Sequence, residues 1–190
     1  MVFPVVLRGL PGTSTRNYPH GTSTSKPVVP VSEQVTLATD RLTLEPLRID
    51  HATEMAGVLA DPALYEFIGG EPPSEADLAA RYTRQLSRDD WRNWIVRERD
   101  TGEPVGTVQA TIADDATAIA WVIATNAQGR GYATEATRAV IENLDAELFI
   151  AYIHPDHAAS RSVAERLGFQ PTDQLKDGEV RWELRGRCQN

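Results

Sequence analysis

A glycine-rich turn leads directly from a strand-like segment into a helix-like segment at residues 128–134, and few folds contain that arrangement. The first N–H groups of a helix have no partner within it, and the helix dipole is positive at that end. Gly129 and Gly131 lack a Cβ, so an anion can approach the backbone, and Arg130 adds a positive charge. The turn is therefore predicted to bind an anion such as a phosphate group.

Two well-known phosphate-binding motifs do not fit this turn. A P-loop needs Lys followed by Ser or Thr after its last glycine, whereas Tyr132 and Ala133 stand there. The dinucleotide fingerprint needs Gly or Ala where this chain has Thr134, and it follows the first strand of a parallel βαβ unit. A helix that is capped by a glycine turn and binds no ligand remains the alternative interpretation.

The segments before the turn predict two helices and an antiparallel sheet. Alternating apolar residues over 42–47 predict a strand, and Asp50 is expected to cap a helix that ends before Asp61. Ser74 and Asp77 form a capping-box pattern that opens a second helix. Three further strands, separated by short turns typical of hairpins, are predicted at Trp91–Glu98, Val105–Ile112 and Ala116–Ile123.

The segments after the turn predict a helix, a strand, a helix and a last strand. Residues 148–153 are apolar on both faces, as in a central buried strand. Asp156 is expected to cap the following helix, which ends at Gly168, and residues 179–184 form the last strand. The residues expected on the inner face of that helix are Ala159, Val163 and Leu167. The predicted fold class is α+β, a three-layer arrangement of helices around one mixed, mostly antiparallel sheet.

The chain length and the composition of its first part predict one domain with an extension. At 190 residues, the chain has the length of one domain, and no internal repeat is evident. Residues 11–31 are rich in Pro, Gly, Ser and Thr and offer little to bury. We therefore expect a flexible arm over residues 1–34, a single domain over 35–186 and a tail over 187–190.

The net negative charge argues against a nucleic-acid partner. The chain has 19 basic and 27 acidic residues, a net charge of −8, and most of the acidic residues lie beyond residue 34. An acidic domain repels a phosphate backbone, so no nucleic-acid partner is expected, and a cationic substrate such as an amine is mildly favoured. Negative charge that simply keeps the protein in solution explains the same composition.

Cysteine and hydropathy patterns predict a cytoplasmic protein. The single cysteine, Cys188, cannot form an internal disulfide. No apolar run approaches the roughly 18 residues of a membrane helix, so no membrane partner is expected. The apolar start has no basic residues before it and is interrupted by Pro4, so a cleaved signal peptide is not expected.

Two separated motifs resemble the GNAT family of N-acetyltransferases. Gln128, Gly131 and Ala133 match its Gln/Arg-x-x-Gly-x-Gly/Ala signature, and residues 155–169 look like its second motif. Residues 39–44 look more narrowly like the branch that contains the ribosomal-protein N-terminal acetyltransferases. The resemblance covers about residues 37–184, with the same order of elements throughout.

That resemblance implies a site for acetyl-CoA as co-substrate, with no metal. In the family, acetyl-CoA lies where two neighbouring strands splay apart, here residues 116–123 and 148–153. Ser160 would lie near the thiol, although a first-turn serine that bonds its own backbone is equally expected. The residues implied in binding acetyl-CoA are Val122, Ile123, Gln128, Gly129, Arg130, Gly131, Tyr132, Ala133, Thr134, His157 and Ser160.

The usual acid and base residues of the family are replaced in this chain. Ala118 stands where the branch often has a glutamate on its fourth strand, and His157 replaces an asparagine of the second motif. Ala164 stands where other branches have a catalytic tyrosine. The candidates that remain for catalysis are Ser160, Glu66 and His157, the last as a proton relay because imidazole titrates near neutrality. The aromatic residues expected to line an acceptor pocket are Tyr65, Phe67 and Trp121.

The resemblance implies transfer of an acetyl group from acetyl-CoA to a primary amine of a small molecule or a protein N-terminus. The amine would attack the thioester directly, with no covalent intermediate on the protein. The alternative is a catalytically weak or inactive acyl-CoA-binding module, since the glutamate is missing. A dinucleotide-dependent oxidoreductase is a third hypothesis. The chain is expected to be a monomer or a homodimer.

Overall fold

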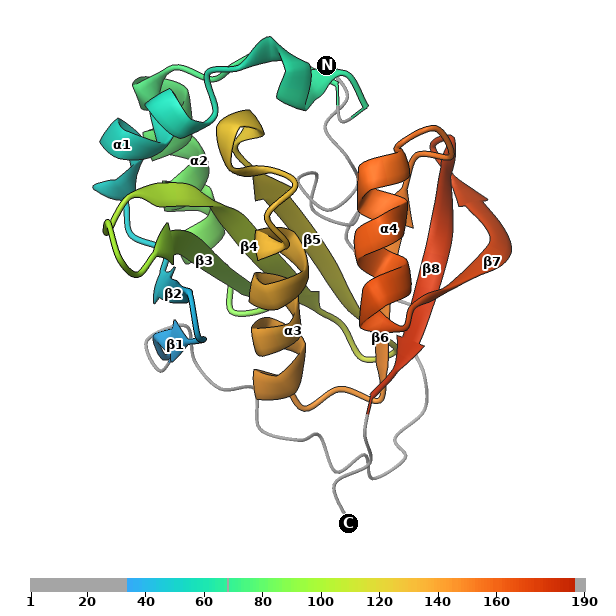
Figure 1. Cartoon of the computed structure of the whole chain (residues 1–190). Coiled ribbons are helices and arrows are strands. Elements are labelled where there is room, and N and C mark those ends of the chain that lie inside the picture. Colours follow the sequence, from blue (N-terminus) through green and yellow to red (C-terminus); the bar gives the residue numbers. More distant parts are fainter. Residues whose placement is uncertain (1–33, 68, 187–190) are drawn as a thin grey trace.

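The computed structural model describes residues 34–67 and 69–186, which form eight strands around which the helices are arranged (Figure 1). The expected arm, apart from Gln34, and the expected tail with Cys188 lie outside these residues. The strands form one sheet in the order β1-β2-β3-β4-β5-β6-β8-β7. Their bounds are β1 (Leu37–Ala38), β2 (Leu42–Pro46), β3 (Trp91–Glu98), β4 (Pro104–Ile112), β5 (Thr117–Ile123), β6 (Leu148–Ile153), β7 (Gln170–Lys176) and β8 (Glu179–Arg185).

The helices lie where the apolar periodicity predicts them. The α-helices are α1 (His51–Val58), α2 (Glu75–Leu86), α3 (Tyr132–Asn143) and α4 (Ala158–Leu167), and two short 3-10 turns are η2 (Pro62–Tyr65) and η3 (Thr125–Ala127). All pairs of neighbouring strands are antiparallel except β5 and β6, which are parallel. The predicted α+β class with a mixed, mostly antiparallel sheet is confirmed.

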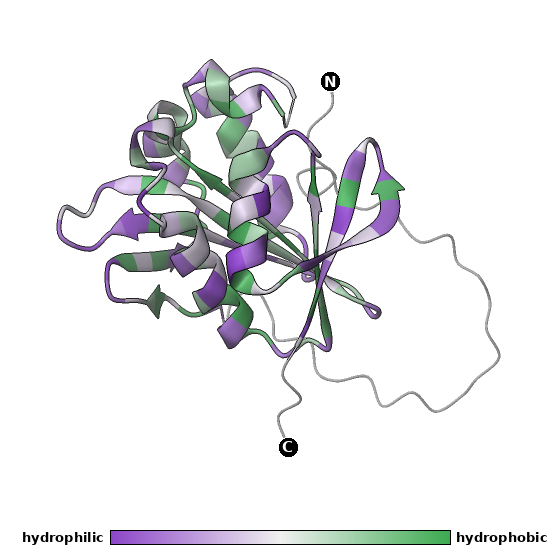
Figure 2. Cartoon of the chain, turned by 45° about the vertical axis from the view of Figure 1, so that its right-hand side comes forward, coloured by the Kyte–Doolittle hydropathy of each residue, from purple (hydrophilic) through white to green (hydrophobic). Residues whose placement is uncertain are grey.

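Two faces of the sheet carry separate apolar clusters. Trp94 and Val96 of β3 belong to the larger cluster, together with Val140 of α3 and Ala164 of α4. Ile95, between them, packs against α1 and α2 in a second cluster. Neighbouring residues of a strand point to opposite faces, so α3 with α4 and α1 with α2 cover opposite faces (Figure 1). Figure 2 shows hydrophobic residues concentrated along the strands inside these layers.

Of the three expected helix caps, one is confirmed and two differ. The capping box of Ser74 and Asp77 on α2 is confirmed. The side chain of Asp50 makes no cap bond on α1, because it pairs with Arg48 at 3.0 Å. The N-cap of α4 is His157 and not Asp156.

The inner face of α4 is shifted by one residue from the expected one. Ala164 is fully buried, whereas Ala159 is exposed and Val163 and Leu167 are half-buried. Gly168 ends the helix with φ of 94°, a left-handed conformation that favours glycine, and Phe169 is buried after it. The expected end of this helix is confirmed.

Candidate functional site

The sheet opens between β5 and β6. The two strands are paired only at Thr117 with Phe149 and at Ala118 with Ile150. Beyond these pairs, β5 remains paired with β4 through Ile123, and β6 remains paired with β8 through Ile153. Residues 119–123 and 151–153 therefore border a V-shaped gap, which we call the split. The resemblance implied splayed strands at this place.

The backbone groups that face the split follow from the ladder between β4 and β5. Ala124 donates its N–H to Val105 at 2.8 Å, so the backbone groups of Ala124 and Val122 point toward β4. Because adjacent residues alternate, the N–H groups of Trp121 and Ile123 point toward the split. For Ile123 this agrees with the expectation, whereas the backbone of Val122 is engaged with β4 and only its side chain lines the pocket described below.

The glycine turn next to the split presents a run of backbone donors. Gly129 and Gly131 have φ of 76° and 84°, and such angles in a side-chain-bearing residue would be strained. Glu135 makes the first helical bond, to the carbonyl of Gly131 at 3.1 Å. Within the part of the chain that the structure describes, the N–H groups of residues 129–134 have no acceptor. This geometry fits an anion at the N-terminus of α3.

Two polar side chains of this turn face the split or are buried beside it. Gln128 donates from Nε2 to the carbonyl of Ile123 at 2.9 Å, which ties the turn to the end of β5. The hydroxyl of Thr134 is buried and has no hydrogen-bond partner among the described residues. A buried hydroxyl without a partner is costly, and a ligand oxygen would remove that cost.

The turn is held from its outer side by two acidic residues. Arg41 binds Glu135 at 2.5 Å and donates to the carbonyl of Arg130 at 2.9 Å. Arg130 itself lies 3.3 Å from Glu98, and Tyr132 donates its hydroxyl to that carboxylate, which lowers the pKa of Glu98. The guanidinium of Arg130 therefore lies against Glu98 and also donates to the carbonyl of Asn126 at 3.3 Å, and its expected contact with a bound anion stays a prediction. The buried ring of Tyr132 leaves only its N–H for a ligand.

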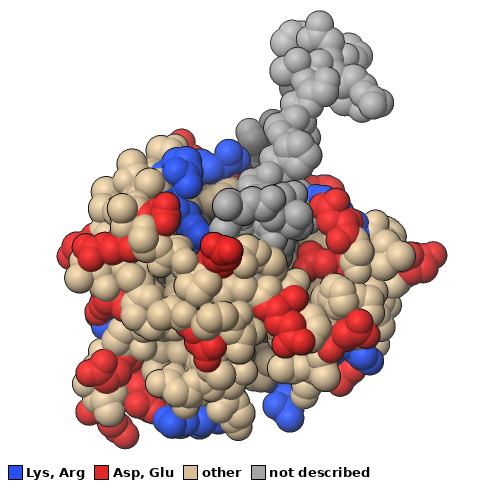
Figure 3. Space-filling model, turned by 90° about the horizontal axis from the view of Figure 1, so that it is seen from above, with Lys and Arg blue, Asp and Glu red and all other residues tan. Residues whose placement is uncertain are grey.

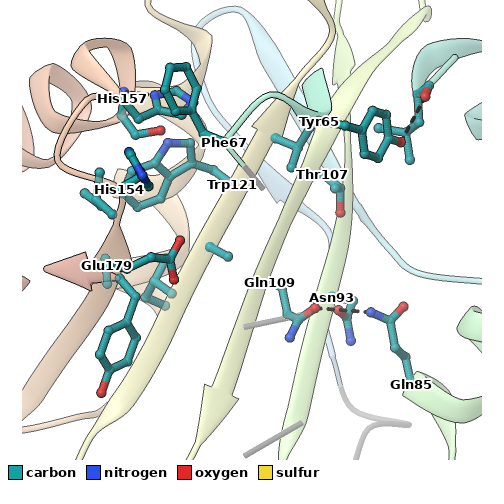
Figure 4. Close-up of a pocket in the computed structure, with 18 of the residues that line it drawn as sticks. Tyr65, Phe67, Gln85, Asn93, Thr107, Gln109, Trp121, His154, His157 and Glu179 are labelled. Carbon is teal, nitrogen blue, oxygen red and sulfur yellow. Dashed lines mark hydrogen bonds between the residues drawn. The ribbon is translucent and has the colours of Figure 1, made fainter. Parts of the chain in front are cut away.

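A pocket opens on the α1–α2 side of the sheet and runs along the split (Figure 4). Asn93, Gln109 and Ala120 are direct neighbours across β3, β4 and β5, and their side chains lie on this face. Ala120 is small, so the floor is open above β5. The predicted aromatic residues Tyr65, Phe67 and Trp121 all line the pocket. Glu66 does not line it and is exposed.

Polar groups occupy the end of the pocket near α2. Gln85 donates to Gln109 at 3.1 Å, and Gln109 donates to Thr111 at 3.2 Å. Asn93 and Arg81 line the same end, and burial lowers the pKa of Arg81. Figure 4 shows Gln85, Asn93 and Gln109 across the pocket from the His154, His157 and Glu179 side chains.

His157 and Ser160 meet at the start of α4. Nδ1 of His157 accepts the N–H of Ser160 at 3.0 Å, and both residues line the pocket. An accepting Nδ1 places the proton of the neutral ring on Nε2. Burial lowers the pKa of His157 and favours this neutral form. His157 can therefore donate from Nε2, but it cannot accept a proton at Nδ1 without losing the helix cap.

Phe67 packs between the two histidines of this wall. Its ring centroid lies 4.6 Å from that of His157 and 5.5 Å from that of His154. The hydroxyl of Ser160 makes no hydrogen bond in residues 34–67 and 69–186, so it does not bond its own backbone.

The same residues hold no group of three metal-binding side chains. No helix in them has the length and apolar character to cross a membrane.

Comparison with known proteins identifies the family. Residues 41–170 match the family model described as an acetyltransferase (GNAT) domain. The chain belongs to the GNAT acetyltransferase family. It is 24% identical over 155 residues to the uncharacterized N-acetyltransferase p20 of Bacillus licheniformis, which covers 76% of this chain and 87% of that protein.

Two solved acetyltransferases share the fold. RimL, a ribosomal-protein alpha-N-acetyltransferase in complex with coenzyme A, is 16% identical, with a TM-score of 0.69 over 80% of this chain and 98% of RimL. The aminoglycoside acetyltransferase AAC(6')-Ib, also with coenzyme A, is 19% identical, with a TM-score of 0.65 over 76% of this chain and 94% of that one. These likenesses extend over nearly the whole of both solved chains.

This GNAT acetyltransferase has one pocket carboxylate that sequence reasoning missed. Glu179, the first residue of β8, is only 8% exposed and lines the pocket. Burial, with the nearby Asp177, raises the pKa of Glu179 to about 7. Nothing in the sequence marks it, because a glutamate after the turn at Asp177 and Gly178 looks like an exposed strand end. Only the pairing of β8 with β6 places it in the pocket.

Proposed function

We propose that this acetyltransferase transfers an acetyl group from acetyl-CoA to the primary amine of a small molecule or a protein N-terminus, by direct attack of the amine. The observation that carries the proposal is the split, which lies next to the unpaired N–H groups of residues 129–134. Family membership supports the acetyl transfer. The coenzyme A bound to RimL and to the aminoglycoside enzyme supports the choice of co-substrate.

The residues along the split fit the successive parts of acetyl-CoA. The N–H groups of residues 129–134 suit the pyrophosphate, and the hydroxyl of Thr134 offers one more donor nearby. The N–H groups of Trp121 and Ile123 suit the amide carbonyls of the pantetheine arm, which then extends β5 like an added strand. Acetyl-CoA supplies the acetyl group as a thioester at the far end of that arm.

The walls of the pocket suit the attacking amine and the departing thiol. The aromatic rings of Phe67 and Trp121 exclude water from the reacting groups. The hydroxyl of Ser160 and Nε2–H of His157 are donors for the sulfur as negative charge develops on it. Glu66 is exposed and lies outside the pocket lining, so the proposal gives it no role.

Calorimetry with acetyl-CoA tests the proposed binding site. Gly131→Glu adds bulk and negative charge among the donors of the turn, so we expect saturable binding to the wild type and a loss of about a hundredfold or more in the variant. Gly102→Glu is the matched control, since Gly102 also has positive φ and open space around it. NAD should not bind. Failure of acetyl-CoA to bind the folded wild type would overturn the proposal.

Amine-dependent release of free thiol from acetyl-CoA tests the transfer itself. Phenethylamine, spermidine and short peptides that begin with Ala or Ser represent the acceptor classes. Ala118, in place of a carboxylate on β5, favours one second candidate, an acyl-CoA-binding module without catalysis. Binding of acetyl-CoA without thiol release for every amine would establish that module instead.

A further inference from the structure

Glu179 lies on the open face of the sheet, at the edge of the split. Val180 pairs with Ile153 and Arg181 pairs with Tyr152, so Glu179 stands level with His154, the residue that follows β6. Because strand residues alternate, Glu179 points away from the core in which Trp182 is buried and toward the face that forms the pocket (Figure 4).

The buried carboxylate of Glu179 lacks a hydrogen bond at one of its two oxygens. It is more than nine-tenths buried, and its Oε2 has no hydrogen-bond partner among the residues described. Arg181, the nearest basic residue on β8, lies 2.8 Å from Glu183. A buried carboxylate oxygen without a hydrogen-bond donor is costly, so the site favours a ligand that brings N–H donors and positive charge.

The other charged and titratable groups around Glu179 come from the hairpin that precedes it, from β6 with the residue after it, and from the start of α4. Asp177 in the turn before β8 raises its pKa, and Lys176 lowers it by a smaller effect than that of burial. Tyr152 of β6, His154 just after that strand and His157, the N-cap of α4, line the same side of the pocket.

We propose that Glu179 receives the ammonium group of the acceptor and is the general base of the transfer, a role that rests on the proposed function above. It takes the place of the carboxylate that β5 lacks at Ala118. The acceptor class is then a primary amine that enters as its ammonium form, with an apolar or aromatic portion that packs on Phe67 and Trp121.

The ammonium gives one proton to the Glu179 carboxylate, and the neutral amine forms a C–N bond to the thioester carbonyl carbon. The C–S bond then breaks, the thiolate leaves with the bonding electron pair, and it takes the second proton lost from nitrogen. Glu179 releases its proton to solvent before the next turnover. No oxidant, reductant or metal is needed.

The acidic surface fits a cationic acceptor. Figure 3 views the end of the molecule at which β5 and β6 finish, and acidic side chains are spread over it, with basic side chains grouped in fewer places. A net charge of −8 raises the local concentration of cations and lowers that of anionic competitors. Because salt screens this attraction, we expect weaker apparent binding of the amine in high salt.

Glu179→Gln tests the role, measured as amine-dependent thiol release between pH 5.5 and 10 with the amines named above. For the wild type, kcat/KM should rise through about pH 7 as Glu179 ionises and then level off. The variant should lose about 10²–10⁴-fold at pH 7.5 and should instead rise up to the pKa of the amine itself. Its affinity for acetyl-CoA should be unchanged.

Two further variants separate catalysis from structure. Asp177→Asn keeps the left-handed turn, since Asp177 has φ of 53° and Asn tolerates it, so it should move the rise in kcat/KM to lower pH without a large loss of rate. Glu142→Gln, which changes an exposed residue of α3, should leave kcat/KM and its pH profile unchanged.

Glu179→Gln should also melt at a higher temperature than the wild type at pH 8 but not at pH 5, because it removes a buried charge.

The outcomes separate this inference from the proposed function. A Glu179→Gln variant with the wild-type rate and pH profile would overturn the role of Glu179 while leaving the acetyl transfer intact. A wild type that binds acetyl-CoA but acetylates none of the amines would overturn both, as would a wild type that does not bind it.

Discussion

At the scale of single residues, His157 links the stability of a helix to the chemistry of the pocket. Its Nδ1 caps α4 by accepting the N–H of Ser160, and its ring packs on Phe67. Only the unprotonated Nδ1 can accept that bond, so the cap depends on the neutral ring. An asparagine, the residue expected here by resemblance, caps a helix equally well through its side-chain oxygen.

His157→Ala should lower the free energy of unfolding by about 0.5–2 kcal/mol at pH 8, because the cap is lost, and His157→Asn should restore most of it. Burial lowers the pKa of His157 below its ordinary value of 6.5. The cap is therefore present above pH 6.5 and is lost as the pH falls through the lowered pKa. Urea unfolding at pH 8 and at pH 5 measures both effects. Equal pH dependence in wild type and His157→Asn would contradict this account.

At the scale of elements, Gly106 sets the position of the end of β5. A Cβ at Gly106 would lie 2.2 Å from the carbonyl oxygen of Val122 and 2.8 Å from Cδ1 of Ile123. Backbone at the end of β5 would have to move to admit even one methyl group. That end of β5 carries the N–H of Ile123 toward the split, so one glycine on β4 controls the geometry of the proposed site.

Gly106→Ala should destabilise the protein by about 1–3 kcal/mol through overpacking. It should also weaken acetyl-CoA binding, because Val122 and Ile123 shift together. Gly57→Ala on α1 is the control, since a Cβ there meets no atom within 4 Å, and it should be neutral or slightly stabilising. Thermal unfolding and calorimetry on both variants check this, and unchanged affinity in Gly106→Ala would show that β5 does not move.

The sequence predicts elements best where the chain alternates or repeats regularly. β2 to β6 and the four α-helices carry apolar faces, so each was predictable within one or a few residues. β7 was not, since its mostly exposed, polar residues include Pro171 and lie at the sheet edge, where no apolar face is needed. β1 is too short to show a pattern.

In the candidate site, too, features set by neighbouring residues were predictable, and features set by distant parts of the chain were not. Local motifs predicted the turn at residues 128–134 and marked His157 and Ser160 as candidates. They did not predict that His157 accepts the N–H of Ser160, because Asp156 was expected to cap α4. The burial of Glu179 in the pocket was not predictable, because it depends on the register of β8 against β6. The partner of Arg130 was not predictable either, because Glu98 comes from a strand 32 residues earlier in the chain.

At the scale of the whole molecule, one layer of helices holds the two halves of the sheet together. The larger core cluster contains Ile119 of β5 on one side of the split and Phe149 of β6 on the other. Val140 of α3 and Ala164 of α4 belong to the same cluster, and the two helices pack against each other. On the opposite face, α1 and α2 pack over β3 and β4, so the split opens to that side.

Hydrogen exchange of individual amides should distinguish the β5 N–H groups that face the split from those that bond to β4. The N–H groups of Trp121 and Ile123 face the split, whereas those of Ala120 and Val122 bond to β4. Without ligand, the first pair should exchange faster than the second pair. Saturating acetyl-CoA should slow Trp121 and Ile123 by about tenfold or more, and NAD should not. Uniform exchange along β5, with or without acetyl-CoA, would argue against pairing in the split.

The split also bears on aggregation. Unpaired strand edges normally lie at the rim of a sheet, where they recruit strands from other molecules. Here the two free edges face each other within the sheet, and α3 and α4 cover one side of them. A second polypeptide would need room for its side chains on both faces, whereas a slender chain of amides and methylenes needs much less. The protein can therefore keep backbone groups open for a ligand without offering them to its neighbours.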